Sequence, residues 1–186
     1  MIKNNTLLIA AGGAGNNSLQ EFVGTDISVD YLHCSSHYTS IKQSKITNYI
    51  YVKPRVFKRR GLNFSLPLRT KKTLSNIVSD YSRVVIVVGL GGLTGSVFTR
   101  EIVRLTKQLY IPVSVVAYLP FSFENKRRLI ALNFLKEFQD NDIDIKPVDH
   151  SVESKKYPMI SLCEYFRMIG AIAHCLIEGI KEYSER

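Results

Sequence analysis

The sequence lacks the features that would place it in an oxidising compartment or a membrane. It contains only three cysteines, an odd number without a CxxC pair, which argues against a disulfide framework. No apolar run approaches the roughly 20 residues of a membrane-spanning helix. The apolar stretch near Met1 is too short for a signal peptide. We therefore expect a cytoplasmic protein.

Acidic residues are missing from a long central segment. Between Tyr31 and Ser79 there is no Asp or Glu but there are ten Lys or Arg, in a chain of net charge +9. A solvated surface explains such a segment. So does a surface that binds an acidic protein, a phosphate-bearing ligand, anionic lipid or nucleic acid. The core of this basic segment, residues 53–72, comprises Lys53, Arg55, Lys58, Arg59, Arg60, Arg69, Lys71 and Lys72.

The positions of the cysteines and histidines give little indication of a metal or redox site. Cys163 and Cys175 fall in a helical apolar pattern and are expected to be small buried side chains. The stretch HCSSH, from His33 to His37, is the only metal-like cluster, and it has no evident fourth ligand. A surface loop is the alternative to a metal site there.

What the sequence does contain is a repeated succession of strand, glycine turn and helix. Val84–Val88 is a run of β-branched residues, typical of a strand buried on both faces. Glycines follow, and four apolar residues then recur at helical spacing: Phe98, Ile102, Leu105 and Leu109. The first-turn amides of a helix have no internal partners and attract anions, so this junction favours phosphate. A plain tight turn is the alternative.

The string GGLTGSV at this junction resembles the phosphate-binding signature GGGTG[ST]G of the tubulin/FtsZ family. The matching residues are Gly91, Gly92, Thr94, Gly95 and Ser96, while Leu93 and Val97 replace two glycines. The resemblance implies that this loop holds nucleotide phosphates.

A second match follows the first predicted strand, where GGAGNNS is similar to the family's GGGGNNA-like nucleotide loop. Taken alone, this turn would also suggest the fingerprint of a dinucleotide-binding site, but the sequence here does not match GxGxxG. The resemblance assigns nucleotide contacts to Gly12, Gly13, Gly15, Asn16 and Asn17.

Two further matches concern the sugar and the base. The stretch from Leu119 to Arg128 resembles the family's TKPFxFEGKKR, which implies ribose contacts for Glu124 and Arg128. A charged first turn of a helix is the local alternative. On the last predicted helix, Phe166 stands where the family stacks an aromatic ring on guanine, although a core phenylalanine explains it too. Val148 and Gly170 replace polar residues that contact the base in the family.

The pattern as a whole predicts a single α/β, Rossmann-like domain over residues 1–186, of the tubulin/FtsZ GTPase-domain type. It has a mostly parallel sheet, helices on both faces and a ligand crevice at the carboxyl ends of the strands. We expect the chain to end in the family's central helix, with the catalytic loop and second domain absent. The predicted strands are Thr6–Ala11, Asp26–Leu32, Ile46–Val52, Val84–Val88, Val113–Tyr118 and Ile143–Ile145; the predicted helices include Thr70–Asp80 and Met159–Tyr183.

The resemblance implies a protein that binds GTP or GDP, with or without Mg²⁺. No catalytic residue is assigned, so we expect at most a weak GTPase that caps or sequesters a filament-forming FtsZ-like or tubulin-like partner. The alternatives are a stand-alone GTPase that uses Asp149, and a degenerate interaction protein that has lost nucleotide binding. Residues 53–72 are expected to contact an acidic partner, and nucleic acid or membrane is less favoured.

Overall fold

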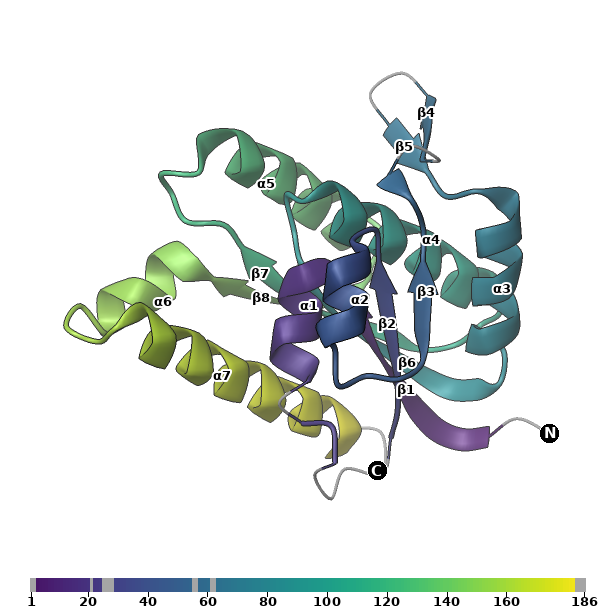
Figure 1. Ribbon diagram of the computed structural model, residues 1–186, viewed down its shortest axis with the longest axis horizontal. Coiled ribbons are helices and arrows are strands. Elements are labelled where there is room, and N and C mark those ends of the chain that lie inside the picture. Colours follow the sequence, from purple (N-terminus) through teal and green to yellow (C-terminus); the bar gives the residue numbers. More distant parts are fainter. Residues whose placement is uncertain (1–2, 21, 25–28, 55–56, 61–62, 183–186) are drawn as a thin grey trace.

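The computed structural model describes residues 3–20, 22–24, 29–54, 57–60 and 63–182. Six parallel strands form one sheet in the order β3-β2-β1-β6-β7-β8, and a separate hairpin pairs β4 with β5 (Figure 1). The strands of the sheet are β1 (Lys3–Ala11), β2 (Asp30–Ser35), β3 (Tyr49–Tyr51), β6 (Tyr81–Gly89), β7 (Val113–Leu119) and β8 (Asp144–Asp149); the hairpin joins β4 (Lys58–Arg60) to β5 (Asn63–Ser65). The helices are α1 (Gly12–Leu19), α2 (Tyr38–Gln43), α3 (Leu68–Val78), α4 (Leu93–Gln108), α5 (Asn125–Gln139), α6 (His150–Lys156) and α7 (Leu162–Glu182).

The strand order creates a switch point in the middle of the sheet. The chain runs outward from β1 to β2 and β3 and then returns to β6 on the other side of β1. Connections on the two sides of this point leave in opposite directions, so a crevice opens at the carboxyl ends of β1 and β6. Both glycine turns lie at this edge, which confirms the predicted fold class.

Side chains alternate between the two faces of the sheet and build two cores. On one face, Ile9, Ile86 and Val88 pack beneath α3, α4 and α5. On the other face, Leu8, Val85 and Val87 pack against α1 and α7. Figure 1 shows these two helical layers on either side of the sheet. Val84–Val88 is fully buried, as the run of β-branched residues predicted.

Only the end of the histidine and cysteine cluster is a surface loop, since His37 is exposed and follows β2. His33 and Cys34 lie in β2 and are fully buried, because this strand sits inside the sheet between β1 and β3. Burial lowers the pKa of His33 to about 4, so the ring is neutral. Within the described part of the chain, no group of three His, Cys, Asp or Glu residues is placed to hold a metal ion.

Several predicted boundaries differ from the structure. β2 begins at Asp30, and residues 26–28 of the predicted strand lie outside the described residues. β3 is shorter than predicted, and β8 extends through Pro147–Asp149, which the sequence placed beyond a strand. The sequence analysis missed α2 and α6, because helices of six and seven residues give too little periodicity.

The long final helix is confirmed, and its buried face agrees in part with the stripe that helical spacing predicts. Of that stripe, Ile169, Ala173 and Ile180 are buried and Leu176 is partly buried, while Leu162 and Phe166 are not buried. Tyr165 and Ile177 are buried, whereas Leu162 is 67% and Phe166 49% exposed. Cys163 and Cys175 are exposed as well, so their assignment to the core was wrong. The predicted and the observed stripes share Ile169, Ala173 and Ile180, so they differ mainly in the first turn of α7, where Tyr165 is buried in place of Leu162 and Phe166. No described helix is both long and apolar enough to cross a membrane.

The packing of α1 on the sheet depends on a missing side chain. A Cβ at Gly15 would lie 2.1 Å from the carbonyl oxygen of Val87 in β6, whereas a Cβ at Gly13 would meet nothing within 4 Å. We predict that Gly15→Ala lowers the free energy of unfolding by at least about 2 kcal/mol, because α1 must move away from the sheet. Urea denaturation followed by circular dichroism measures this change.

Gly13→Ala is the matched control, since the same substitution two residues earlier in α1 adds a methyl group to open space. It should leave stability unchanged or raise it by up to about 1 kcal/mol. A Gly15→Ala protein as stable as the parent would contradict the close approach of α1 to β6.

Candidate functional site

Three turns meet backbone to backbone at the carboxyl edge of the sheet. Gly12 has a φ of +77°, and a Cβ there would lie 3.3 Å from the amide nitrogen of Gly95 in α4. Gly91 has a φ of +85°, and its Cβ would lie 2.3 Å from the carbonyl oxygen of Arg127 in α5. Glycine is favoured at both positions, because a side chain would be strained by the positive φ, and at Gly91 it would also collide with the backbone of Arg127. The glycines of both sequence motifs therefore set how close the turns come.

The starts of α1 and α4 lie side by side in this crevice and share one electrostatic property. Neither has a side-chain cap, because their N-cap residues are Ala11 and Gly92, and neither has an acidic residue in its first turn. The free amides and the helix dipole leave partial positive charge at each start. Two such starts in contact suit the phosphate groups of a nucleotide.

The polar residues of the two motifs have different surroundings. The Thr94 hydroxyl hydrogen-bonds with that of Ser36, and Ser44 donates to Oδ1 of the buried Asn16 at 2.5 Å. These contacts attach the segment after β2 to the glycine turns. Asn17 is exposed and lines a cavity beside α1. Ser96 is buried, and its hydroxyl has no hydrogen-bond partner in the described part of the chain.

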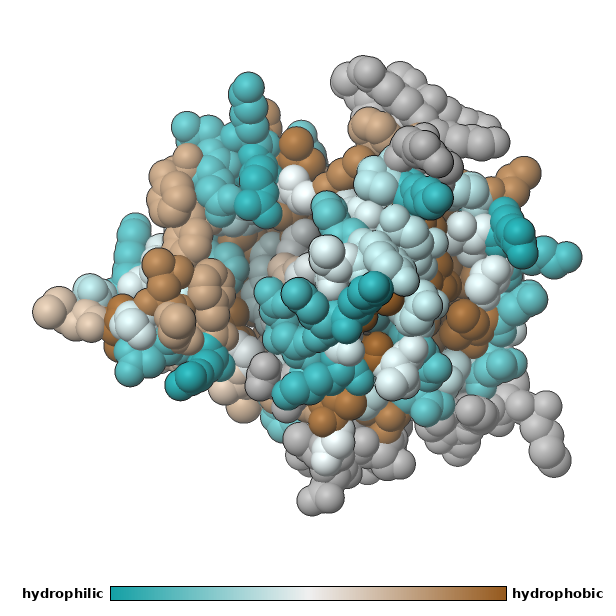
Figure 2. Space-filling view, in the orientation of Figure 1, coloured by the Kyte–Doolittle hydropathy of each residue, from teal (hydrophilic) through white to brown (hydrophobic). Residues whose placement is uncertain are grey.

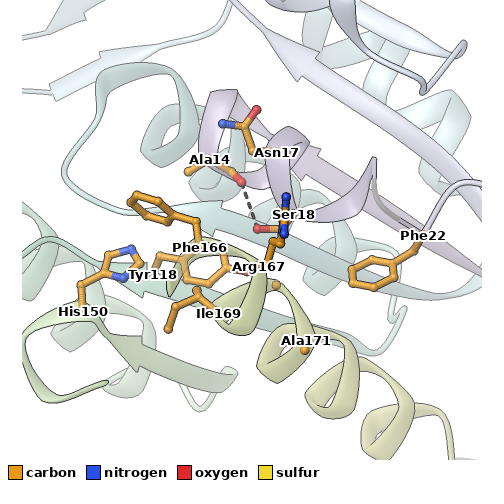
Figure 3. Close-up of a pocket in the computed structure, with 11 residues that line it drawn as sticks. Ala14, Asn17, Ser18, Phe22, Tyr118, His150, Phe166, Arg167, Ile169 and Ala171 are labelled. Carbon is orange, nitrogen blue, oxygen red and sulfur yellow. Dashed lines mark hydrogen bonds between the residues drawn. The ribbon is translucent and has the colours of Figure 1, made fainter. Parts of the chain in front are cut away.

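The cavity beside α1 has a volume of about 480 Å³, within the usual range for small-molecule sites. Phe166 lies at this cavity with half of its surface exposed, so it is not a core side chain (Figure 3). Gly170 lines it too, and a Cβ there would meet nothing within 4 Å. The full lining is Ala14, Asn17, Ser18, Phe22, Tyr118, His150, Phe166, Arg167, Ile169, Gly170 and Ala171. We call it the base-side cavity.

An aromatic cluster that sequence reasoning missed forms one wall of this cavity. The His150 ring stacks on Tyr118 at 5.6 Å and on Phe121 at 5.1 Å, and its Nδ1 lies 2.9 Å from the Tyr165 hydroxyl. Burial lowers the pKa of His150, although the nearby carboxylates of Glu124 and Asp149 oppose the shift. The ring is therefore a neutral, flat surface at pH 7. Phe166 meets the same ring edge-on, with ring centroids 5.8 Å apart. The four partners of His150 come from distant parts of the sequence, so no local pattern reveals them.

Glu124 and Arg128 stabilise the turn between β7 and α5 through hydrogen bonds and ion pairs. The Glu124 carboxylate accepts from the amide of Phe121 at 3.2 Å and pairs with Arg127 at 2.5 Å. Arg128 donates two hydrogen bonds to Asp149, at 2.9 and 2.6 Å, and one to the carbonyl of Pro120. Neither Glu124 nor Arg128 is among the described residues that line the base-side cavity.

Asp149 is a structural acid in this arrangement. Hydrogen bonds from Arg128 hold its pKa below the usual range, and it also caps α6 by accepting from the amide of Ser151 at 2.8 Å. A carboxylate with a lowered pKa and three hydrogen bonds is a poor proton acceptor at neutral pH. The geometry thus gives little support to Asp149 as the catalytic group of a stand-alone GTPase.

Strand order, glycine turns and crevice together define a Rossmann-like α/β domain. No family model matches the sequence. The FtsZ cell division protein of Buchnera aphidicola subsp. Baizongia pistaciae is 25% identical over 194 residues, covering 97% of this chain and 50% of that protein. The FtsZ of Aquifex aeolicus is 24% identical and is likewise covered to 50%.

Solved structures share the fold. An empty FtsZ dimer from M. jannaschii superposes with a TM-score of 0.75 at 19% identity, covering 91% of this chain and 52% of that one. CetZ from Methanosaeta thermophila gives a TM-score of 0.70 at 19% identity, covering 96% of this chain and 54% of that one. The resemblance of this chain to the tubulin/FtsZ family is confirmed, and the chain spans about half the length of the curated relatives it matches.

The ion pair between Arg128 and Asp149 should make stability depend on pH. Because the pKa of Asp149 is lower in the folded than in the unfolded chain, the pair stabilises above about pH 4, and this contribution is lost as the pH falls through the folded pKa. We predict that Asp149→Asn, which keeps the helix cap, lowers the free energy of unfolding by about 1–2 kcal/mol at pH 7. The deficit should shrink towards pH 3 in urea denaturation curves.

The pair between Asp144 and Lys146 is the matched control. Both side chains are nearly half exposed, so water screens the interaction and Asp144→Asn should cost less. Equal losses for the two variants, or a deficit of Asp149→Asn that persists below pH 3, would count against a stabilising role of the partly buried Arg128–Asp149 pair.

Proposed function

We propose that this chain binds a guanine nucleotide, GTP or GDP, at the carboxyl edge of its sheet. The observation that carries the proposal is the contact between two uncapped helix starts, next to a cavity walled by aromatic rings. The first feature suits phosphates and the second suits a flat base. The FtsZ relatives lend support, because their family's nucleotide loops match both glycine turns.

Each part of the nucleotide has candidate partners. The phosphates would lie over the starts of α1 and α4, held by the amides around Gly12, Gly13, Gly92 and Thr94. Mg²⁺ would be bound through those phosphates. The base would enter the base-side cavity against Phe166, and the ribose would lie towards the turn that carries Glu124.

Affinity should be lower than in a complete family member. The two positions that carry polar base contacts in the family offer none here, because Val148 is buried and apolar and Gly170 has no side chain. A polar group of the base that is buried without a hydrogen-bond partner costs about 1–3 kcal/mol. Isothermal titration that shows no heat with GDP or GTP, at hundreds of micromolar protein, would favour the alternative of an interaction protein that binds no nucleotide.

Gly13 offers a sharp test of the phosphate site. We predict that Gly13→Ala weakens GDP binding at least about tenfold in isothermal titration, because a methyl group would keep the phosphates away from the α1 amides. The fold should be unaffected, since the position is open. Gly179→Ala in α7 is the control, as it also adds a methyl group to open space but lies outside the crevice.

The same titration can place the base. Gly170→Asn would add an amide to open space in the base-side cavity, so GDP binding should tighten severalfold while ADP binding changes less. Equal changes for GDP and ADP would mean that the base lies elsewhere.

We further infer a role in modulating a filament-forming FtsZ-like or tubulin-like protein in the cytoplasm. Support comes from the names of structural neighbours, among them the TubZ protofilament of bacteriophage PhiKZ, with a TM-score of 0.62 at 16% identity. A head-to-tail filament needs two different faces on each subunit. A nucleotide-binding domain would present one of them, and so act as a cap or a sequestering subunit.

Substoichiometric addition of this chain to polymerising FtsZ tests the role. We predict less light scattering and slower GTP turnover than with an unrelated protein of similar charge, because blocked ends no longer grow. The chain alone should turn over GTP slowly or not at all, since Asp149 is engaged with Arg128. No change in either signal, together with no crosslinked complex, would refute this role.

A further inference from the structure

A second cavity, of about 380 Å³, lies across the glycine turn from the base-side cavity, and none of the described residues lines both. It is bounded by the first turns of α4, the middle of α5 and β5. Figure 2 shows apolar atoms in the hollow between α5 and the hairpin. The lining residues are Phe64, Gly91, Gly92, Leu93, Ser96, Val97, Arg100, Ile130 and Phe134. We call it the α4 cavity.

The walls of the α4 cavity expose apolar surface and an unsatisfied polar group. Leu93 and Ile130 are 41% and 45% exposed, although both are large aliphatic side chains. Ser96 is only 2% exposed, and its hydroxyl has no partner in the described part of the chain. Burying a hydroxyl without a hydrogen bond is costly. A ligand that covers the aliphatic groups and reaches Ser96 would remove both costs.

The cavity continues into a cationic stretch along α4. A neighbouring cavity of about 460 Å³ shares Phe64, Val97 and Arg100 with it and adds Lys71 and Arg104. In the described part of the chain, Arg100 pairs with Glu137, and both Lys71 and Arg104 pair with Glu101, so three cations meet two carboxylates. Lys71 belongs to the basic segment of residues 53–72, which has no acidic residue of its own. Positive charge is therefore in excess at this end.

The charge balance identifies the kind of occupant. A second copy of this chain would bring a net charge of +9 to a surface that is already cationic, which disfavours self-association. A nucleic acid would meet the cations but would leave Leu93 and Ile130 without an apolar partner. An acidic polypeptide with one large apolar side chain complements both ends, as in helix-in-groove recognition.

We propose that the α4 cavity is a docking site for an acidic segment of a partner protein. One aliphatic or aromatic side chain of the partner fills the cavity between Leu93 and Ile130, and its carboxylates meet Arg100 and Arg104. Val97 and Arg104 are seven positions apart on α4, about 10 Å along the helix. An acid that meets Arg104 must therefore lie about two helical turns from the anchor, whereas an acid that meets Arg100, which lines the cavity itself, lies closer to the anchor.

Selection from a displayed library of random peptides of about 12 residues, with the folded chain as target, tests the proposal. The selected peptides should carry one large apolar residue and at least two acids within about two helical turns of it. A synthetic copy should bind in fluorescence anisotropy, more weakly as salt is raised. Selected peptides without acidic residues, or with affinity insensitive to salt, would overturn the proposal.

Two neighbouring residues of α5 give a matched pair of variants. Ile130 lines the cavity, whereas Leu129 is 63% exposed and is not among the described lining residues. Ile130→Asp should weaken the selected peptide at least about tenfold, because the anchor would face a carboxylate in place of an aliphatic wall and the peptide's acids would meet a like charge. Leu129→Asp adds the same charge one position away and should change affinity less than threefold.

Arg104→Gln should lower affinity severalfold and flatten the salt dependence, since it removes one cation from the acid-binding end. Equal effects of Ile130→Asp and Leu129→Asp would overturn the proposal. So would competition by an oligonucleotide that is insensitive to Ile130→Asp, which would assign the surface to nucleic acid. Unchanged thermal melting of each variant, measured in parallel, shows that the comparison is made on folded protein.

Discussion

The structure depends on close backbone contacts made at glycines. α1 packs on β6 where Gly15 meets the Val87 carbonyl, and the turn after β1 touches α4 where Gly12 meets Gly95. Gly91 brings the turn after β6 against α5 in the same way. These contacts fix three helices at one edge of the sheet. The position of every group around the crevice follows from them.

The sequence predicts the parts of this arrangement that are local. A run of β-branched residues predicts a buried strand, and glycines at a strand end predict a turn, so the fold and the place of the crevice follow from short stretches. Contacts between distant residues have no such signal. Arg128 and Asp149 are 21 positions apart, and the four partners of His150 come from β7, the turn after it and α7. Nothing in the sequence near any one of these residues indicates which distant residue it contacts.

The buried face of α7 shows a different limit of prediction from sequence. Tyr165 and Phe166 are adjacent aromatic residues, and helical spacing allows either of them to lead the buried stripe. The sheet resolves the ambiguity, because Tyr165 reaches the His150 ring and its carbonyl while Phe166 turns to the cavity. The exposure of Cys163 and Cys175 follows from the same choice of buried face. The buried side of an amphipathic helix can thus be predicted well only when the surface on which the helix packs is known.

The two uncapped helix starts have a consequence for the protein when its crevice is empty. Their partial positive charges lie together without a carboxylate in either first turn, so the folded state carries a local repulsion that an anion relieves. Ligand that binds only the folded chain adds stability, about 2.7 kcal/mol at a hundredfold excess over Kd. The share of molecules open to cellular proteases would then fall as the anion becomes abundant, and the lifetime of the protein would follow the supply of its ligand.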